Sequence, residues 1–159
     1  MSPRLYFSYS QFMVYDKDVA LPGCDWTDEH SDQGFARRES TVNFGTILEF
    51  GYADVAVSRG RYEYREEYER IIAVPFFVSS GEVIVDGPDE MESGRIIALP
   101  PGHYRLVAAQ YDTSDDEEAI DLFFEPVAEP LERSAVLLAD EDLHPPATLI
   151  ETAQIAGEG

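Results

Sequence analysis

Carboxylates are the residues of this sequence with the clearest capacity for chemistry, and they gather in two places. The run 112–118 contains five of them, and Asp25, Asp28 and Glu29 surround the only tryptophan. Closely spaced carboxylates can form an acid–base pair or bind calcium. However, the run 112–118 lacks the glycine and the alternating acids of an EF-hand loop. A solvated acidic loop is therefore the favoured interpretation, and we predict no metal site.

Other groups that support catalysis are dispersed or absent. His30, His103 and His144 are scattered, and none has a second His or Cys at a metal-ligand spacing. The sequence contains no glycine-rich phosphate loop and no Gly-x-Ser-x-Gly segment. Cys24 is the single cysteine, and we favour a structural thiol over a reactive one. We predict a protein that is not an enzyme, without catalytic residues or cofactors.

The charge of the chain is strongly negative. Its 159 residues include 32 acidic and 11 basic ones, which give a net charge of −21. From Asp112 onward fourteen acidic residues face one base, Arg133. This charge repels nucleic acid and anionic membranes and speeds encounters with basic partners. Solubility and salt adaptation are alternative reasons for it. We expect a basic partner and no direct binding of nucleic acid.

The composition indicates one folded domain, because 44% of the residues are hydrophobic. No run of about 18 apolar residues is present, which predicts that no segment spans a membrane. The N-terminus alternates polar and apolar residues and lacks the continuous apolar region of a signal peptide. A single cysteine excludes an internal disulfide, so we predict a cytoplasmic location.

The elements that must position these residues are mostly strands. Apolar residues alternate with polar ones, and turns recur at the spacing of a β-sandwich or barrel. Pro75 interrupts an apolar run and, because proline has no N–H, indicates an edge or a bulge. We predict one strand, or two with a bend, near residues 5–14. Further strands are predicted near residues 42–50, 53–57, 71–78, 83–85, 95–99, 103–111 and 119–126.

One short helix is predicted at residues 27–34. Thr27 suits the N-cap, Asp28 and Glu29 favour the positive end of the helix dipole, and Gly34 suits the position after the last turn. For Trp26 we favour a place in the core over a role as an interface anchor. The predicted fold class is all-β, an antiparallel β-sandwich with one short helix.

The end of the chain differs in character, since several prolines interrupt it. We predict a β-sandwich domain over residues 1–126 and an acidic, proline-containing C-terminal extension over 127–159. Within the extension, residues 135–138 form a strand or one helical turn.

Four segments carry a resemblance to a known family. They are Ser8–Tyr15, Asp25–Glu29 with the following Gly34–Ala36, Val74–Phe76 and Leu99–Leu106. In order and spacing over about residues 5–126, the sequence resembles the competence protein J family, the DNA-entry nuclease inhibitors of competent bacteria. The segment Trp26–Glu29 is fairly specific, whereas the segment Pro101–Leu106 is common in β-sandwiches.

The resemblance implies an acidic inhibitor that binds a nuclease with a basic surface and blocks its DNA-binding groove. The candidate partner-binding residues are acids of the two groups, Asp25, Asp28, Glu29, Asp115, Asp116, Glu117 and Glu118. For Asp25, Asp28 and Glu29, helix capping is the competing role. The alternative function is a β-sandwich module that binds a small or basic ligand unrelated to nucleases.

Overall fold

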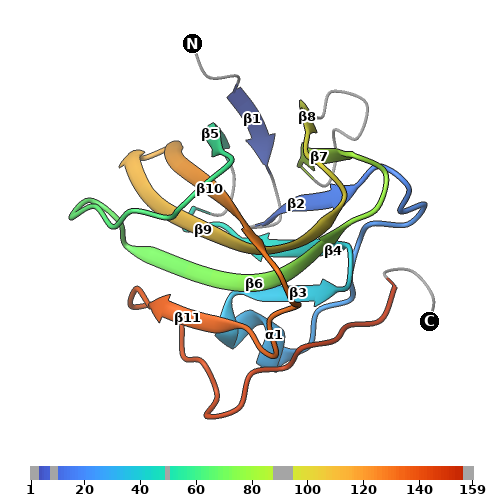
Figure 1. The fold of residues 1–159 in the computed structure, drawn as a ribbon. Helices are drawn as coiled ribbons and strands as arrows, with labels where there is room; N and C mark the ends of the chain where they lie inside the picture. The colour runs from blue at the N-terminus through green and yellow to red at the C-terminus, as the bar shows by residue number, and fades with distance from the viewer. Residues whose placement is uncertain (1–3, 8–10, 49–50, 88–94, 156–159) are drawn as a thin grey trace.

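In the part of the chain that the structure describes, the fold consists of two β-sheets packed face to face and one short helix. The computed structural model describes residues 4–7, 11–48, 51–87 and 95–155. Helix α1, Asp28–Gln33, lies at the lower end of the sandwich in Figure 1. The predicted β-sandwich with one short helix is confirmed, including the helix bounds set by Thr27 and Gly34.

The larger sheet has six strands in the order β1-β5-β10-β9-β6-β11. Their bounds are β1 Arg4–Phe7, β5 Gly51–Ser58, β6 Arg70–Val78, β9 Gly102–Ser114, β10 Glu117–Val127 and β11 Ala135–Leu138. Neighbouring strands run antiparallel except β5 and β10, which are parallel over 52–58 and 117–123. Parallel neighbours need a long crossover connection, and here the chain between them builds strands of both sheets.

The smaller sheet has five strands in the order β3-β4-β2-β7-β8, all antiparallel. Their bounds are β2 Gln11–Asp16, β3 Phe35–Arg38, β4 Thr41–Gly45, β7 Glu82–Asp86 and β8 Arg95–Ala98. Parts of two predicted strands, residues 8–10 and 49–50, lie outside the described residues.

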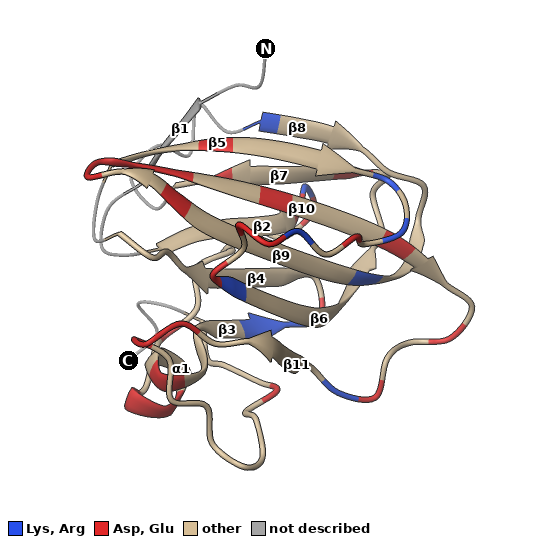
Figure 2. Ribbon diagram, turned by 90° about the vertical axis from the view of Figure 1, so that its left-hand side faces the viewer, with Lys and Arg blue, Asp and Glu red and all other residues tan. Residues whose placement is uncertain are grey.

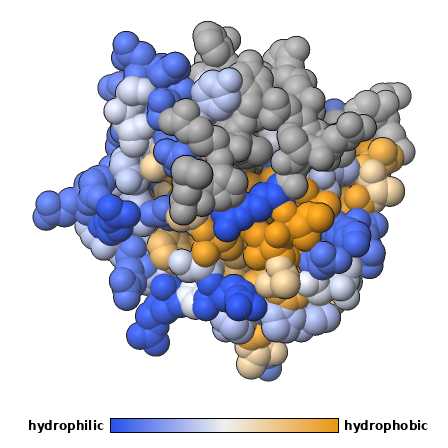
Figure 3. All heavy atoms as spheres, turned by 90° about the horizontal axis from the view of Figure 1, so that it is seen from above, coloured by the Kyte–Doolittle hydropathy of each residue, from blue (hydrophilic) through white to orange (hydrophobic). Residues whose placement is uncertain are grey.

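The hydrophobic core fills the space between the sheets. On β10, Ile120, Leu122 and Phe124 are fully buried and alternate with more exposed residues, as a strand with one inward face requires. Phe12 and Phe44 stack across the smaller sheet with ring centroids 5.3 Å apart. Figure 3 views the end of the sandwich opposite α1, where apolar side chains gather with hydrophilic ones around them.

Pro75 lies where β6 has a neighbouring strand on one side only. It faces Arg105 of β9, and on the other side β11 pairs with β6 only at 71–73. The edge position predicted for Pro75 is therefore confirmed, because its missing N–H interrupts no described strand pairing on that side. Residues 135–138 form a strand, β11, which settles the choice between strand and helical turn.

The C-terminal residues that follow β11 run beside α1 and β3 (Figure 1). Gln33 Nε2 donates to the carbonyl oxygen of Ile150 at 2.9 Å, and Ile150 N donates to Gln33 Oε1 at 2.9 Å. Asp25 N donates to the carbonyl oxygen of Gln154 at 2.8 Å. The division of the chain at residue 126 stays a prediction, while these contacts of the C-terminal residues with the sandwich are observed. No helix in the described ranges has the length and apolar character needed to cross a membrane.

Candidate functional site

The α1 segment presents acidic side chains to solvent. A capping box fixes its first turn: Thr27 Oγ1 accepts from His30 N at 3.3 Å, and His30 Nδ1 accepts from Thr27 N at 3.0 Å. Asp28 and Glu29 in that turn are exposed, and Asp25 just before it is half-buried. Capping is thus carried by Thr27 and His30, which leaves the carboxylates of Asp28 and Glu29 facing water. Their contact with a partner stays a prediction.

The second predicted acidic group, at the turn between β9 and β10, is only partly on the surface. Asp115 and Asp116 are exposed and Glu117 is half-buried. The expectation that Glu118 is exposed is wrong, because its exposed fraction is 1%. Strand β10 begins at Glu117, so the alternation of the strand directs Glu118 inward together with Ile120. The predicted acidic loop over 112–118 is correspondingly shorter.

Glu118 has a structural role in the sandwich. Its Oε2 accepts hydrogen bonds from Ile47 N at 3.0 Å and Leu48 N at 3.1 Å. Burial raises the pKa of the Glu118 carboxyl to about 7, although these two N–H groups and the nearby Arg70 favour the charged form. Glu118 therefore holds the segment after β4 against the larger sheet and is out of reach of a partner.

The two predicted groups do not converge. Figures 1 and 2 place α1 at the lower end of the sandwich and the β9–β10 turn higher up, on its flank. C-terminal residues join α1 instead, since His144 N donates to the carbonyl oxygen of Asp32 at 2.8 Å. Five exposed acids result, here named the helix-side acidic patch: Asp28, Glu29, Asp32, Glu141 and Asp142.

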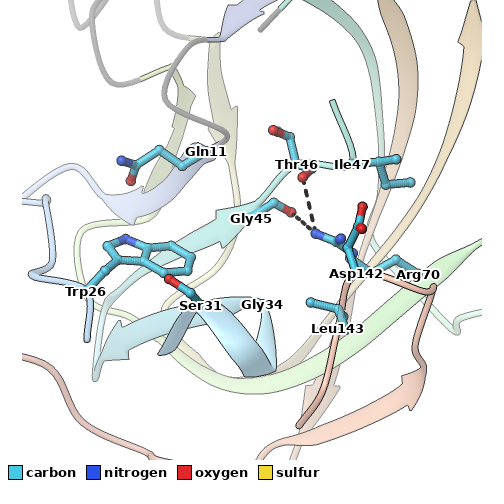
Figure 4. A pocket seen from close by; sticks show the side chains of 10 residues that line it. All are labelled: Gln11, Trp26, Ser31, Gly34, Gly45, Thr46, Ile47, Arg70, Asp142 and Leu143. Carbon is cyan, nitrogen blue, oxygen red and sulfur yellow. Dashed lines mark hydrogen bonds between the residues drawn. The ribbon is translucent and has the colours of Figure 1, made fainter. Parts of the chain in front are cut away.

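A pocket of about 430 Å³, here named the α1–tail pocket, opens beside this patch (Figure 4). Its lining combines the start of β2, the α1 segment, the end of β4 with the two residues after it, the start of β6 and the C-terminal residues: Gln11, Trp26, Ser31, Gly34, Gly45, Thr46, Ile47, Arg70, Asp142 and Leu143. Gly34 and Gly45 are joined by a hydrogen bond from Gly45 N to the Gly34 carbonyl oxygen at 2.8 Å. A Cβ at Gly45 would lie 3.3 Å from Arg70 Nη1, so the absence of a side chain there lets Arg70 approach the end of β4 closely.

Among the described residues that line this pocket, Arg70 is the one basic residue, and it is almost completely buried. Its Nε and Nη2 donate to Asp140 at 2.9 and 3.0 Å. Its Nη1 donates to the carbonyl oxygens of Gly45 at 3.0 Å and Thr46 at 3.3 Å. The positive charge is therefore paired, and most of the guanidinium donors are already used.

Trp26 lies at the wall of the pocket, half-buried, and is not part of the core. The prediction that Trp26 lies in the core is therefore wrong. The core beneath α1 is filled by other side chains, such as Leu143, whose methyl groups lie about 3 Å from the position of a Cβ built on Gly34. Among the described residues, the buried Nε1 of Trp26 has no hydrogen-bond partner.

The remaining reactive residues are placed separately. Burial raises the pKa of the Cys24 thiol, which keeps it protonated and agrees with the structural role predicted for it. His30 is part of the helix cap, and His103 packs against Phe77 with ring centroids 4.8 Å apart. In the described part of the chain, no three His, Cys, Asp or Glu side chains are grouped in a way that suits a metal ion.

The pocket was not predictable from the sequence, because its walls come from segments that lie far apart along the chain. Arg70 and Asp140 are 70 positions apart, and Asp142 and Leu143 lie in the proline-containing extension. The one available signal was the charged Arg70 directly before the apolar run of β6, where an inward-facing base needs a partner.

The fold and its surface define an acidic, two-sheet β-sandwich domain. A family model described as Competence protein J (ComJ) matches residues 4–128, and the chain belongs to this family. The DNA-entry nuclease inhibitor of Bacillus subtilis (strain 168) is 30% identical over 103 residues, which cover 65% of this chain and 76% of that protein. The resemblance found in the sequence is thereby confirmed. Residues 129–159 lie beyond the matched segment.

Two solved structures share the fold. The crystal structure of Bacillus subtilis ComJ, described as the inhibitor of the DNA-degrading activity of NucA, has a TM-score of 0.65 and 22% identity. The match covers 80% of this chain and 96% of that one. A structure described as crocagin biosynthetic gene J has a TM-score of 0.53 and 17% identity, over 77% and 94% of the two chains. At these identities, the two matches establish a shared fold and nothing further.

Proposed function

We propose that this chain binds a DNA-degrading nuclease and inhibits it, without catalysing a reaction itself. The observation that carries the proposal is the family match over residues 4–128, together with a curated relative that is a DNA-entry nuclease inhibitor. Both concern homologues, so the activity of this chain is our inference from kinship. The net charge of −21 supports it, because a nuclease must present a basic surface to DNA.

The inhibition we propose is electrostatic and steric. Exposed carboxylates of the helix-side acidic patch occupy positions that DNA phosphates otherwise take in the basic groove. The same negative charge keeps the inhibitor away from DNA and raises the rate at which it meets the nuclease. Asp115 and Asp116 supply a second acidic surface, on the flank of the sandwich (Figure 2).

A DNA digestion assay tests the function directly. The purified protein is titrated against a nuclease of the NucA type, encoded beside it where such a gene exists, and the rate of digestion is measured. We expect digestion to stop near a stoichiometric ratio and the inhibition to weaken as salt is raised. Unchanged digestion in the presence of excess protein would refute the proposed function.

One observation favours the alternative of a ligand-binding module. The α1–tail pocket of about 430 Å³ is within the size range of small-molecule sites. The fold itself is compatible with either function, because one fold hosts many functions. The alternative gains support only if the protein fails to affect the nuclease in the digestion assay.

A further inference from the structure

We propose that the α1–tail pocket receives the side chain of a lysine or arginine from the nuclease partner. This inference rests on the proposed function and makes it more specific, because it names one basic side chain as the anchor of the complex. Three properties of the pocket support it: its charge, its shape and the two parts of the chain that line it.

The charge of the pocket excludes an anionic ligand. Arg70 is the only base that the structure describes in the lining, and its Nε, Nη1 and Nη2 already donate to Asp140, Gly45 and Thr46. Asp142, one of the exposed carboxylates of the helix-side acidic patch, lines the pocket itself, and Asp32 directly follows the lining residue Ser31. A cation is therefore attracted to this opening, while a phosphate or carboxylate meets repulsion.

The shape of the pocket suits a long basic side chain. Figure 4 shows the indole of Trp26 on one side of the pocket and Asp142 with Leu143 on the other. An aliphatic stem can pack against Trp26, Ile47 and Leu143, as lysine and arginine stems do on apolar surfaces. The cationic head then lies near the Asp142 carboxylate, with which it can form a charge-assisted hydrogen bond.

The pocket combines two parts of the chain. Trp26, Ser31 and Ile47 belong to the segment matched by the family, whereas Asp142 and Leu143 lie beyond residue 128. The C-terminal residues thus complete one wall and supply the carboxylate that meets the cation. We infer that this extension adjusts the family surface to the particular nuclease of this protein.

A binding experiment with single substitutions tests the inference. The dissociation constant of the complex with the nuclease is measured for Asp142→Asn, which removes the charge, and Ser31→Tyr, which fills the pocket. The matched controls are Asp18→Asn, at an exposed acid that neither lines the pocket nor belongs to the helix-side acidic patch, and Ser58→Tyr, at an exposed serine of β5. We expect each pocket variant to weaken binding about tenfold and each control to stay within about twofold.

The single tryptophan offers a second measurement. With 5-fluorotryptophan in place of Trp26, one fluorine resonance reports the pocket, and the unlabelled nuclease adds none. We expect this resonance to shift on complex formation. If the complex forms but the resonance stays in place, or the pocket variants bind as tightly as the controls, the pocket inference is overturned and the proposed function stands. If the unmodified protein forms no complex, the proposed function fails and this inference fails with it.

Discussion

Arg70 and Asp140 form a two-point ion pair between the first residue of β6 and the chain after β11, with N···O distances of 2.9 and 3.0 Å. Their side chains are 4% and 10% exposed, so the pair is shielded from water. Asp140 lies beyond the segment matched by the family model. The ion pair therefore fastens the C-terminal residues to the sandwich beside the α1–tail pocket.

Loss of the Asp140 carboxylate should destabilise the protein strongly. The substitution Asp140→Ala leaves the buried Arg70 charge without its partner, for which the expected cost is about 3 kcal/mol in the free energy of unfolding. Urea unfolding at pH 7, followed by circular dichroism, measures it.

The exposed ion pair of Lys17 and Glu82 provides the matched control. Its side chains are 53% and 42% exposed, and Glu82→Ala changes the net charge by the same amount as Asp140→Ala. Exposed pairs contribute less than about 1 kcal/mol, so this variant should unfold almost like the parent protein. Equal losses in the two variants would contradict a special role for the buried pair.

Local patterns were sufficient to predict much of the fold. Thr27 and Gly34 mark the ends of α1 because capping depends on residues within one turn of the helix. Strands β9 and β10 were predictable from alternation, since each has a face that packs into the core. The parallel pairing of β5 with β10 was not, because it depends on where distant strands lie in the sheet.

The candidate site was less predictable, and Glu118 and Trp26 show why. Glu118 stands in a run of acids that resembles a solvated loop, so its inward direction becomes visible only once β10 is known to begin at Glu117. Trp26 was expected in the core on the general behaviour of large aromatic residues. Its place at a pocket wall depends on C-terminal residues such as Leu143, which pack under α1 from more than 100 positions away.

Gly34 should tolerate no side chain. Its φ is +88°, and a Cβ built there lies 3.0 Å from Ile72 Cδ1 and from Leu143 Cδ2. Both the backbone conformation and this crowding oppose Gly34→Ala, for which we expect a loss of about 1 to 3 kcal/mol in the free energy of unfolding. Gly60→Ala is the control, because nothing lies within 4 Å of the added Cβ. Similar melting temperatures for the two variants would refute this interpretation.

The stability of the protein should depend on the protonation of Glu118. Burial raises the pKa of this carboxyl to about 7, above that of the unfolded chain. At a pH between these two pKa values, the folded protein holds a proton that the unfolded chain has released. The contribution of Glu118 to the stability of the folded state therefore decreases as pH rises. Glu118→Gln keeps an oxygen acceptor for Ile47 N and Leu48 N and removes this dependence.

Unfolding of the parent protein and Glu118→Gln by urea, compared at pH 5 and pH 8, measures the effect. We expect the variant to gain stability relative to the parent as pH rises, by on the order of 3 kcal/mol. Asp115→Asn, at an exposed acid of the neighbouring turn, should show almost no such gain. A stability difference between the parent and Glu118→Gln that is the same at both pH values would contradict the raised pKa.

Two triple substitutions distinguish the helix-side acidic patch from the acids of the β9–β10 turn. One variant carries Asp28→Asn, Glu29→Gln and Asp32→Asn, and the other carries Asp115→Asn, Asp116→Asn and Glu117→Gln. Both raise the net charge by the same amount, so a general effect of charge slows association with the nuclease equally. If the nuclease approaches the α1–tail pocket, the first variant should associate about tenfold more slowly than the second at low salt.

Stopped-flow mixing over a salt series measures both rates, and the difference should shrink as salt screens the charges. Equal rates at every salt concentration would show that overall charge, and not the patch beside the pocket, steers the encounter.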